Sequence, residues 1–107
     1  MYDVIIIGAG PAGISAGIYA VSRGQKTLIL EKNQVGGLIR RVSAVTHYAA
    51  IVEGETGESF AKRLRKQAEN AGVEILQTEV KKVELTGVEK RIYTEKECYC
   101  AKKVILA

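Results

Sequence analysis

The chain has 107 residues, which allows one domain at most. Hydrophobic residues make up 47% of it and charged residues 26%, with a single proline, so the composition is that of a globular segment and excludes a disordered tail. The formal net charge of +4 comes from basic residues interleaved with acids, and we therefore expect no nucleic-acid partner.

The sequence also bears on location. An apolar run follows Met1-Tyr2-Asp3 directly, without the basic start and cleavage site of a secretory signal. No apolar run approaches the roughly 20 residues that cross a bilayer, and the two cysteines do not make a disulfide framework. We expect a cytoplasmic protein without a membrane partner.

The first third of the chain predicts a strand–helix–strand unit. Residues 4–7 form a β-branched run, typical of a parallel strand buried on both faces. Residues 11–22 have a helical pattern that starts with proline, and Gly24 suits the left-handed position after a helix end. Residues 26–30 then indicate a second strand. One face of the helix carries only small residues, which would let it lie close to the sheet: Gly13, Ala16, Gly17 and Ala20.

The middle of the chain predicts a long connection, a helix and a strand. Residues 32–57 have no clear period, and long connections in compact domains are often functional. Residues 59–71 predict a helix that Gly72 ends, followed by a parallel strand over residues 73–76. The helix has an apolar stripe on one side: Phe60, Leu64, Ala68 and Ala71.

The last part of the chain predicts an antiparallel meander. Residues 80–85 alternate as in a strand with one wet face, and residues 91–94 and 97–101 continue the meander. Residues 104–106 indicate one more buried strand. Together the elements predict an α/β fold of the Rossmann type, with a parallel sheet, flanking helices and a small meander. Because the chain stops at Ala107, directly after that strand, we expect residues 1–107 to be the N-terminal part of an incomplete domain.

The connection between the first strand and the first helix is a Gly-rich loop. Gly8 permits a tight turn out of the strand, Gly10 lets backbone approach a pyrophosphate, and Gly13 lets helix and strand pack closely. The start of the helix would then bind the phosphates through unpaired N–H groups. The loop reads Gly8-Ala9-Gly10-Pro11-Ala12-Gly13.

Glu31 follows the second strand, where its carboxylate can accept hydrogen bonds from both ribose hydroxyls of an adenosine. A 2′-phosphate would be repelled there. Strand, loop, helix and acid together predict dinucleotide binding, and they leave FAD and NAD as alternatives.

The segment 2–13, with Glu31-Lys32 and Gly36-Gly37, resembles the N-terminal FAD-binding segment of the low-molecular-weight thioredoxin reductases. The resemblance covers nearly the whole chain and continues through residues 57–60 and 103–107. In that family the first Gly-rich loop binds FAD and a second one, in an inserted domain, binds the nicotinamide cofactor. The resemblance therefore implies FAD for this loop.

The resemblance also implies site residues. Gly10, Pro11, Ala12 and Gly13 would contact the FAD pyrophosphate, and Glu31 with Lys32 the adenosine ribose. The backbone of Val80 would recognise the adenine edge.

The flavin side of the site departs from the family pattern. The resemblance implies that Gly36, Gly37 and the residue after them line it, but that residue is Leu38 in place of the usual Gln, so it cannot form a hydrogen bond. The usual Asn-aromatic-Pro-Gly is replaced by residues 47–50, His-Tyr-Ala-Ala. We expect His47 to substitute for the family's amide, bonding within the loop or to the cofactor, with a role in tuning the flavin as an alternative.

Two cysteines occur late in the chain. Cys98 and Cys100 lie on one face of a predicted strand, and the family's redox pair is a C-x-x-C in a domain that this chain lacks. We interpret them as ordinary strand residues, and we expect no metal site and no catalytic residue in this chain.

Members of the family are much longer than this chain. The resemblance implies a parent flavoprotein, a homodimer that passes electrons from NAD(P)H through FAD to a thioredoxin-like protein. The chain alone is not expected to complete that reaction. Two other interpretations stay open: a non-catalytic module that binds FAD or an adenine nucleotide, and the NAD-binding domain of a dehydrogenase.

Overall fold

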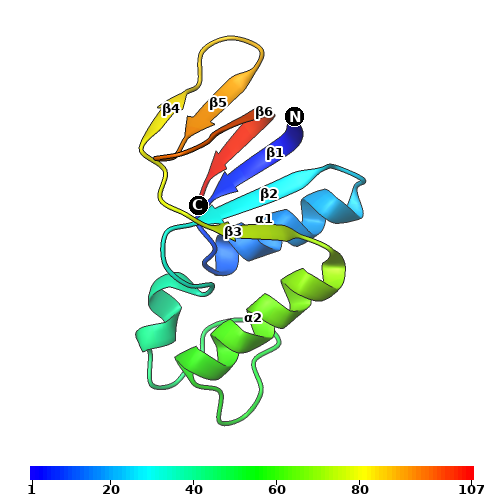
Figure 1. Ribbon diagram of the computed structural model, residues 1–107. Helices are drawn as coiled ribbons and strands as arrows, with labels where there is room; N and C mark the ends of the chain where they lie inside the picture. The colour runs from blue at the N-terminus through cyan, green and yellow to red at the C-terminus, as the bar shows by residue number, and fades with distance from the viewer.

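The computed structural model describes residues 1–107 as one mixed sheet of six strands with two α-helices against one face (Figure 1). Along the chain the elements are β1 (Tyr2–Ile7), α1 (Pro11–Ser22), β2 (Thr27–Glu31), the 3-10 helix η1 (Gly37–Arg41), α2 (Gly57–Ala71), β3 (Glu74–Gln77), β4 (Lys82–Glu84), β5 (Lys90–Tyr93) and β6 (Cys98–Leu106). The strand order across the sheet is β3-β2-β1-β6-β5-β4. The predicted α/β fold is confirmed.

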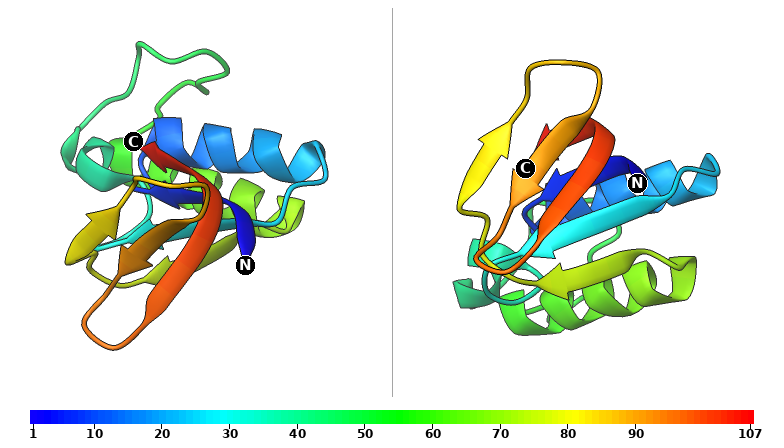
Figure 2. Two further views of the ribbon diagram at one scale, coloured as in Figure 1. Left: turned by 90° about the horizontal axis from the view of Figure 1, so that it is seen from above. Right: turned by 45° about the horizontal axis from the view of Figure 1, so that its top comes forward.

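The parallel half of the sheet is built around β1. Ile5 pairs with Leu28 of β2 on one side and with Val104 of β6 on the other, and β3 extends this half beyond β2. Ile5 and Ile6 are fully buried, as expected for an apolar run enclosed on both faces. The four parallel strands end at one edge, and the C-terminus lies beside the start of α1 (Figure 2).

Both helices cover the same face of the sheet. The predicted bounds of α1 are confirmed, and Gly24 has the expected left-handed backbone with φ 78°. A Cβ at Gly17 would lie 2.8 Å from Cδ1 of Ile29 in β2, so the small residues do let α1 lie close to the sheet. No helix is long and apolar enough to cross a bilayer. The opposite face holds a smaller buried cluster: Ile5, Leu28, Leu30, Ile92 and Ala101.

The last strand differs from its prediction. Residues 97–101 and 104–106 were expected as separate strands, but β6 is continuous because its edges serve two partners, β5 in antiparallel and β1 in parallel pairing. Its end is not buried, since Ile105 is 40% and Leu106 68% exposed. Ile105 pairs with Ile6 and shares the helix-covered face, but α1 packs over β1 and β2 and leaves the end of β6 open.

The strand predicted over residues 80–85 is shorter than expected. Only Lys82–Glu84 pairs with β5, and Val80 lies before the strand, in the connection from β3. The expectation of one buried face is also wrong, since Val83 and Leu85 are 37% and 41% exposed. The reason is that β4 is an edge strand of the meander and no helix of this chain covers it.

The second helix begins at Gly57 rather than at the predicted Ser59, because Thr56 caps it. Thr56 Oγ1 accepts the N–H of Ser59 at 3.1 Å, and Ser59 Oγ accepts the N–H of Thr56 at 3.0 Å. These reciprocal bonds satisfy N–H groups that otherwise lack partners at a helix start. The predicted apolar stripe is confirmed, with Phe60, Leu64 and Ala68 buried.

Replacing Thr56 by Ala should lower the free energy of unfolding by about 1 kcal/mol, the usual cost of losing a helix cap. Urea denaturation of the intact protein measures this change. Thr86→Ala, at an exposed position between β4 and β5, is the control and should change stability little. Equal changes in the two variants would contradict the capping role.

Candidate functional site

The Gly-rich loop leaves β1 and enters α1 with a geometry that two of its glycines require. Gly8 has φ 111°, and a Cβ there would lie 2.6 Å from the carbonyl oxygen of Ala107. A Cβ at Gly13 would lie 1.9 Å from the carbonyl oxygen of Gly8, far inside van der Waals contact. The roles predicted for Gly8 in the turn and Gly13 in close packing therefore match the structure.

Gly10 is different, because the fold itself does not need a glycine there. Its φ of −74° suits any residue, and the nearest atom to a Cβ, the carbonyl oxygen of Gly36, would be 3.8 Å away. The space above Gly10 is therefore open to a group that approaches the backbone closely. This opening is what a pyrophosphate at the loop requires.

The start of α1 offers hydrogen-bond donors to such a group. No side chain caps α1, and its first turn has no acidic residue. In α2, by contrast, Thr56 and Ser59 form the capping box and Glu58 adds an acid to the first turn. The N–H groups and the positive dipole end of α1 are thus left for an external anion, and phosphate fits them.

Glu31 holds the loop in place. Its Oε1 accepts the N–H of Ala9 at 2.7 Å, and its Oε2 accepts the N–H of Asn33 at 2.8 Å. Each carboxylate oxygen has a second lone pair, so ribose hydroxyls can still bind. The predicted ribose ligand therefore also fixes the Gly-rich loop, a role that the sequence did not reveal.

A hollow of about 250 Å³ lies beside Glu31 at the edge where the parallel strands end. Its lining includes Gly8, Glu31, Lys32 and Val80, which are far apart in the sequence. Although Val80 is not in a strand, it lines this hollow together with Glu31. The hollow can accommodate part of an adenosine.

Sequence reasoning missed Glu79 at the rim of this hollow. Its carboxylate lies 2.8 Å from Nζ of Lys81 and 3.3 Å from Nζ of Lys32. The hydrogen bond from Lys81, followed by that from Lys32, lowers the pKa of Glu79, so the group is ionised at neutral pH. The only signal in the sequence was an acid next to Val80 and two residues before Lys81. Lys32 is thereby held at the rim, where the ribose contact was predicted.

Gly36 and Gly37 pack against the Gly-rich loop from the other side. The N–H of Gly36 donates to the carbonyl oxygen of Ala9 at 2.7 Å, and a Cβ at Gly37 would lie 3.7 Å from Cα of Gly10. Both have left-handed backbones, with φ 106° and 58°. Leu38 follows in η1 and is 77% exposed, so its side chain lies free beside Gly37.

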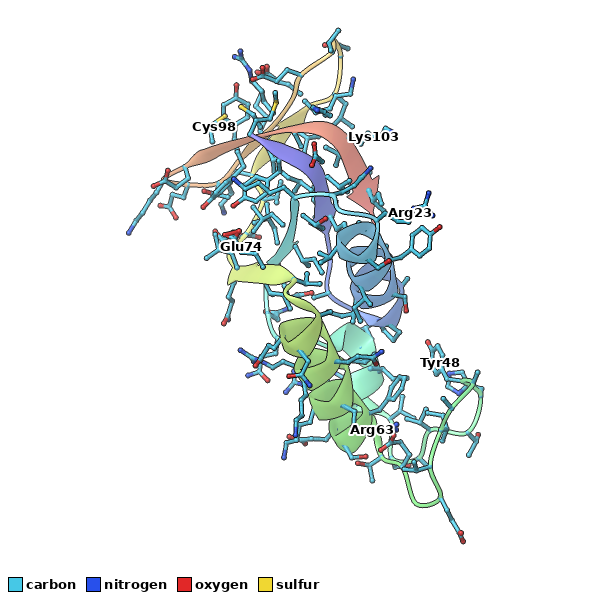
Figure 3. All side chains as sticks on the ribbon, turned by 90° about the vertical axis from the view of Figure 1, so that its right-hand side faces the viewer. Arg23, Tyr48, Arg63, Glu74, Cys98 and Lys103 are labelled. Carbon is cyan, nitrogen blue, oxygen red and sulfur yellow. The ribbon has the colours of Figure 1, made fainter.

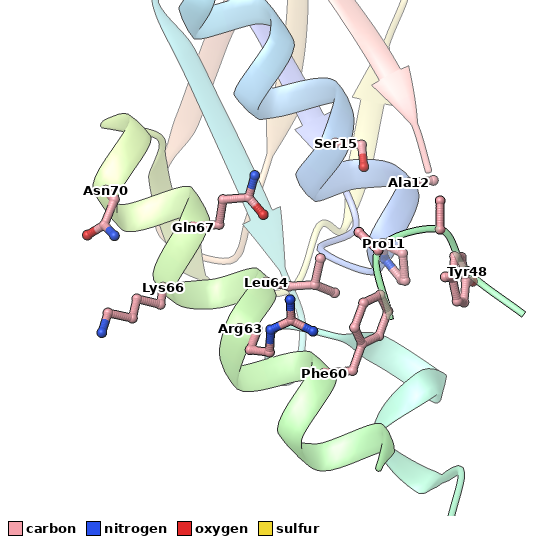
Figure 4. Close-up of a pocket in the computed structure, with 12 residues that line it drawn as sticks. Pro11, Ala12, Ser15, Tyr48, Phe60, Arg63, Leu64, Lys66, Gln67 and Asn70 are labelled. Carbon is pink, nitrogen blue, oxygen red and sulfur yellow. The ribbon is translucent and has the colours of Figure 1, made fainter. Parts of the chain in front are cut away.

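The structure places His47 apart from this cluster, on the exposed connection between η1 and α2. Its ring lies against that of Tyr48, tilted by 41° with the centroids 4.5 Å apart, and the centroid of the Tyr48 ring in turn lies 5.2 Å from that of Phe60. A groove of about 720 Å³ runs between α1, α2 and this connection (Figure 4). Tyr48, Pro11 and Arg63 are among its lining residues, so the groove joins the start of α1.

The two cysteines lie away from the site. Both are free thiols on β6, and Cys98 is at the far end of the molecule from Tyr48 and Arg63 (Figure 3). A hydrogen bond with Glu89 raises the pKa of the Cys100 thiol, which keeps it protonated and weakly nucleophilic. Their interpretation as strand residues fits this placement, and no group of side chains could hold a metal ion.

Comparisons with known proteins place this geometry in a family. The chain is 40% identical over 107 residues to the thioredoxin reductase of Peptoclostridium acidaminophilum, covering all of this chain and 34% of that protein. It therefore spans about a third of the length of that relative. The loop, the sheet and the helices are thus shared with one part of a longer enzyme.

Solved structures give the same result. The crystal structure of Lactococcus lactis thioredoxin reductase matches with a TM-score of 0.92 and 33% identity, covering 99% of this chain and 35% of that one. A ferredoxin-flavin thioredoxin reductase from Clostridium acetobutylicum matches with a TM-score of 0.88 and 28% identity, covering 98% and 36%. The family model described as pyridine nucleotide-disulphide oxidoreductase matches residues 2–107. The chain belongs to the pyridine nucleotide-disulphide oxidoreductase family, as a thioredoxin-reductase-like flavoprotein segment.

Proposed function

We propose that residues 1–107 are the first part of the FAD-binding domain of a reductase that moves electrons from NAD(P)H to a disulfide in a thioredoxin-like protein. The observation that carries the proposal is the open backbone at Gly10, in front of a helix start that has no cap of its own. The fold does not need that glycine, but a bound pyrophosphate does.

In this proposal, different residues of the chain bind different parts of FAD. The backbone of Gly10 to Gly13 would bind the pyrophosphate, and Glu31 with Lys32 the ribose. The backbone of Val80 would meet the adenine in the hollow beside Glu31. Gly36 and Gly37 would extend the site towards the flavin, with Leu38 and His47 as its outer contacts.

FAD, when bound, supplies the two-electron carrier between the nicotinamide donor and the disulfide. This chain contributes binding and orientation, and we assign no catalytic residue to it. The proposal includes a homodimeric, cytoplasmic parent with no nucleic-acid or membrane partner. The chain by itself is not expected to turn over.

The proposal has two candidates for the electron donor, of which NAD(P)H is the first. Leu38 and His47 depart from the family pattern on the flavin side, and one protein of similar structure is a ferredoxin-flavin thioredoxin reductase. A donor other than NAD(P)H is therefore the second candidate.

Steady-state assays of the intact protein with NADPH, NADH and reduced ferredoxin should show reduction of the thioredoxin disulfide with at least one of these donors. We expect that donor to be NADPH or NADH. Thioredoxin thiols are counted as the product. Absence of reduction with all three donors contradicts the assigned activity. A flavin absorbance band without turnover supports a non-catalytic FAD module, and a colourless protein that binds NAD but not FAD supports a dehydrogenase domain.

Gly10→Ala should fold with unchanged stability, because its Cβ has room, yet lose most FAD binding, because the methyl group occupies the approach to the phosphates. Gly13→Ala is the matched variant and should lose both stability and FAD, since its Cβ collides with Gly8. Thermal unfolding and flavin content of the purified proteins distinguish the two losses. Normal FAD binding by Gly10→Ala would refute the pyrophosphate site.

Glu31→Gln should weaken FAD binding by about 1–3 kcal/mol, or roughly 5- to 150-fold, since charge-assisted hydrogen bonds to the ribose become neutral ones. Titration of the apoprotein with FAD measures the change. Glu69→Gln, at an exposed ion pair on α2, is the control and should bind FAD normally. Similar affinities for both variants would remove Glu31 from the ribose site.

A further inference from the structure

The connection between η1 and α2, residues 42–56 and here called the 42–56 loop, ends in a buried carboxylate. Glu55 is 4% exposed, and it is the one charged residue among the buried ones. A buried charge is costly unless it is paired and hydrogen-bonded. The proposed FAD contacts give no reason for a charge at this position.

Two side chains of α2 bind the Glu55 carboxylate. Ser59 Oγ donates a hydrogen bond to Oε2, and Arg63 Nη1 donates one to Oε1. The bond from Ser59, together with that from Arg63, lowers the pKa of Glu55 against the effect of burial. The carboxylate is therefore ionised at neutral pH and both its oxygens are held by α2.

The backbone of Glu55 is bonded to the rest of the loop. Its carbonyl oxygen accepts the N–H of Val45 at 2.9 Å, and its own N–H donates to the carbonyl oxygen of Val52 at 3.2 Å. Val45 is 1% exposed and belongs to the core under the helices. Glu55 thus joins the two limbs of the loop to each other and, through its carboxylate, to α2.

The limb between Val45 and Val52 contains His47 and Tyr48. Tyr48 lies against Phe60 of α2 and lines the groove that reaches Pro11 at the start of α1. Figure 4 shows Arg63 projecting from α2 beside Phe60, into the same groove. The contacts of Glu55 therefore act on the one stretch of the loop that borders the proposed cofactor site.

An apolar side chain would fill the position of Glu55 without the desolvation cost of a charge. It would not select one arrangement, because hydrophobic contacts have no direction. A carboxylate that accepts directional hydrogen bonds from two side chains of α2 does select one arrangement of the loop. The charge is thus explained by the placement of the loop rather than by the stability of the fold.

We propose that Glu55 is a positioning residue, which through Ser59 and Arg63 holds the 42–56 loop so that His47 and Tyr48 stand at the flavin end of the bound cofactor. The inference rests on the proposed FAD function. It assigns a role to residues that have no contact with the predicted pyrophosphate and ribose positions.

The test uses the intact protein and three variants, Glu55→Leu, Glu55→Gln and Arg63→Met, with Arg65→Met as control. Arg65 lies on the same helix and pairs with Glu69 in solvent, away from the loop. FAD affinity is measured by titration, and the visible circular dichroism and fluorescence of bound flavin report its surroundings. Cleavage by chymotrypsin after Tyr48 reports whether the loop is held.

Glu55→Leu and Arg63→Met should weaken FAD binding about tenfold, change the flavin dichroism and speed cleavage at Tyr48, because charge-assisted contacts are lost. Glu55→Gln keeps an acceptor oxygen and should restore part of each signal. Arg65→Met should match the wild type in all three measurements. A loss of stability alone would leave the flavin dichroism unchanged, so this signal separates positioning from a structural role.

Wild-type FAD binding and dichroism in all folded variants would overturn the inference and leave the proposed function intact. If Glu55→Leu does not fold, Glu55→Gln and Arg63→Met decide in the same way. Failure of the wild type to bind FAD overturns the proposed function, and the inference with it.

Discussion

The approach of α1 to the end of β1 is the constraint on which the site depends. Gly13 lies so near the carbonyl oxygen of Gly8 that a single methyl group at Gly13 would separate helix from strand. Because of this approach, the first N–H groups of α1 face the edge where the parallel strands end. Two hydrogen bonds to Ala9 then fix the loop. The carboxylate of Glu31 accepts the N–H of Ala9, and the N–H of Gly36 donates to its carbonyl oxygen, at 2.7 Å in each case. The proposed anion site thus follows from packing, without a basic side chain.

The topology explains why the candidate site lies at this edge. From β1 the chain crosses through α1 to β2 on one side, and β6 returns to β1 on the other. Crevices form outside the carboxyl ends of parallel strands where such connections diverge. Glu31 and Val80 come from different strand ends, yet both line the hollow there. Residues distant in sequence therefore meet because their strands run in parallel.

The parts predicted correctly from sequence have local causes. Pro11 and Gly24 mark the two ends of α1 because one lacks an N–H and the other adopts φ 78°. The errors have tertiary causes. Lys102 and Lys103 interrupt the apolar pattern, but β6 continues through them because β1 and β5 both pair with it. The prediction that Ile105 and Leu106 are buried was wrong. Burial depends on which other elements cover a strand, and the residues of the strand itself do not determine this.

The same distinction applies to the site. The Gly-rich loop and Glu31 stand in a local pattern, so their positions could be predicted. Glu55 could not, because a carboxylate before a helix normally indicates a solvated position near the dipole, whereas this one is buried under Arg63 and Ser59. Its partners depend on how the 42–56 loop folds back onto α2, and no periodic pattern in the sequence predicts that fold of the loop.

The two ends of the proposed site are thus held by different physical means. At the phosphate end, backbone contacts between glycines leave no freedom, and the geometry is fixed by sterics. At the proposed flavin end, an ion pair between the buried Glu55 and the half-exposed Arg63, with a few hydrogen bonds, holds an exposed loop, and such directional bonds can be altered by a single substitution. Changes at Leu38 and His47 therefore fall where the structure tolerates them, whereas the fold admits no side chain at Gly8 or Gly13.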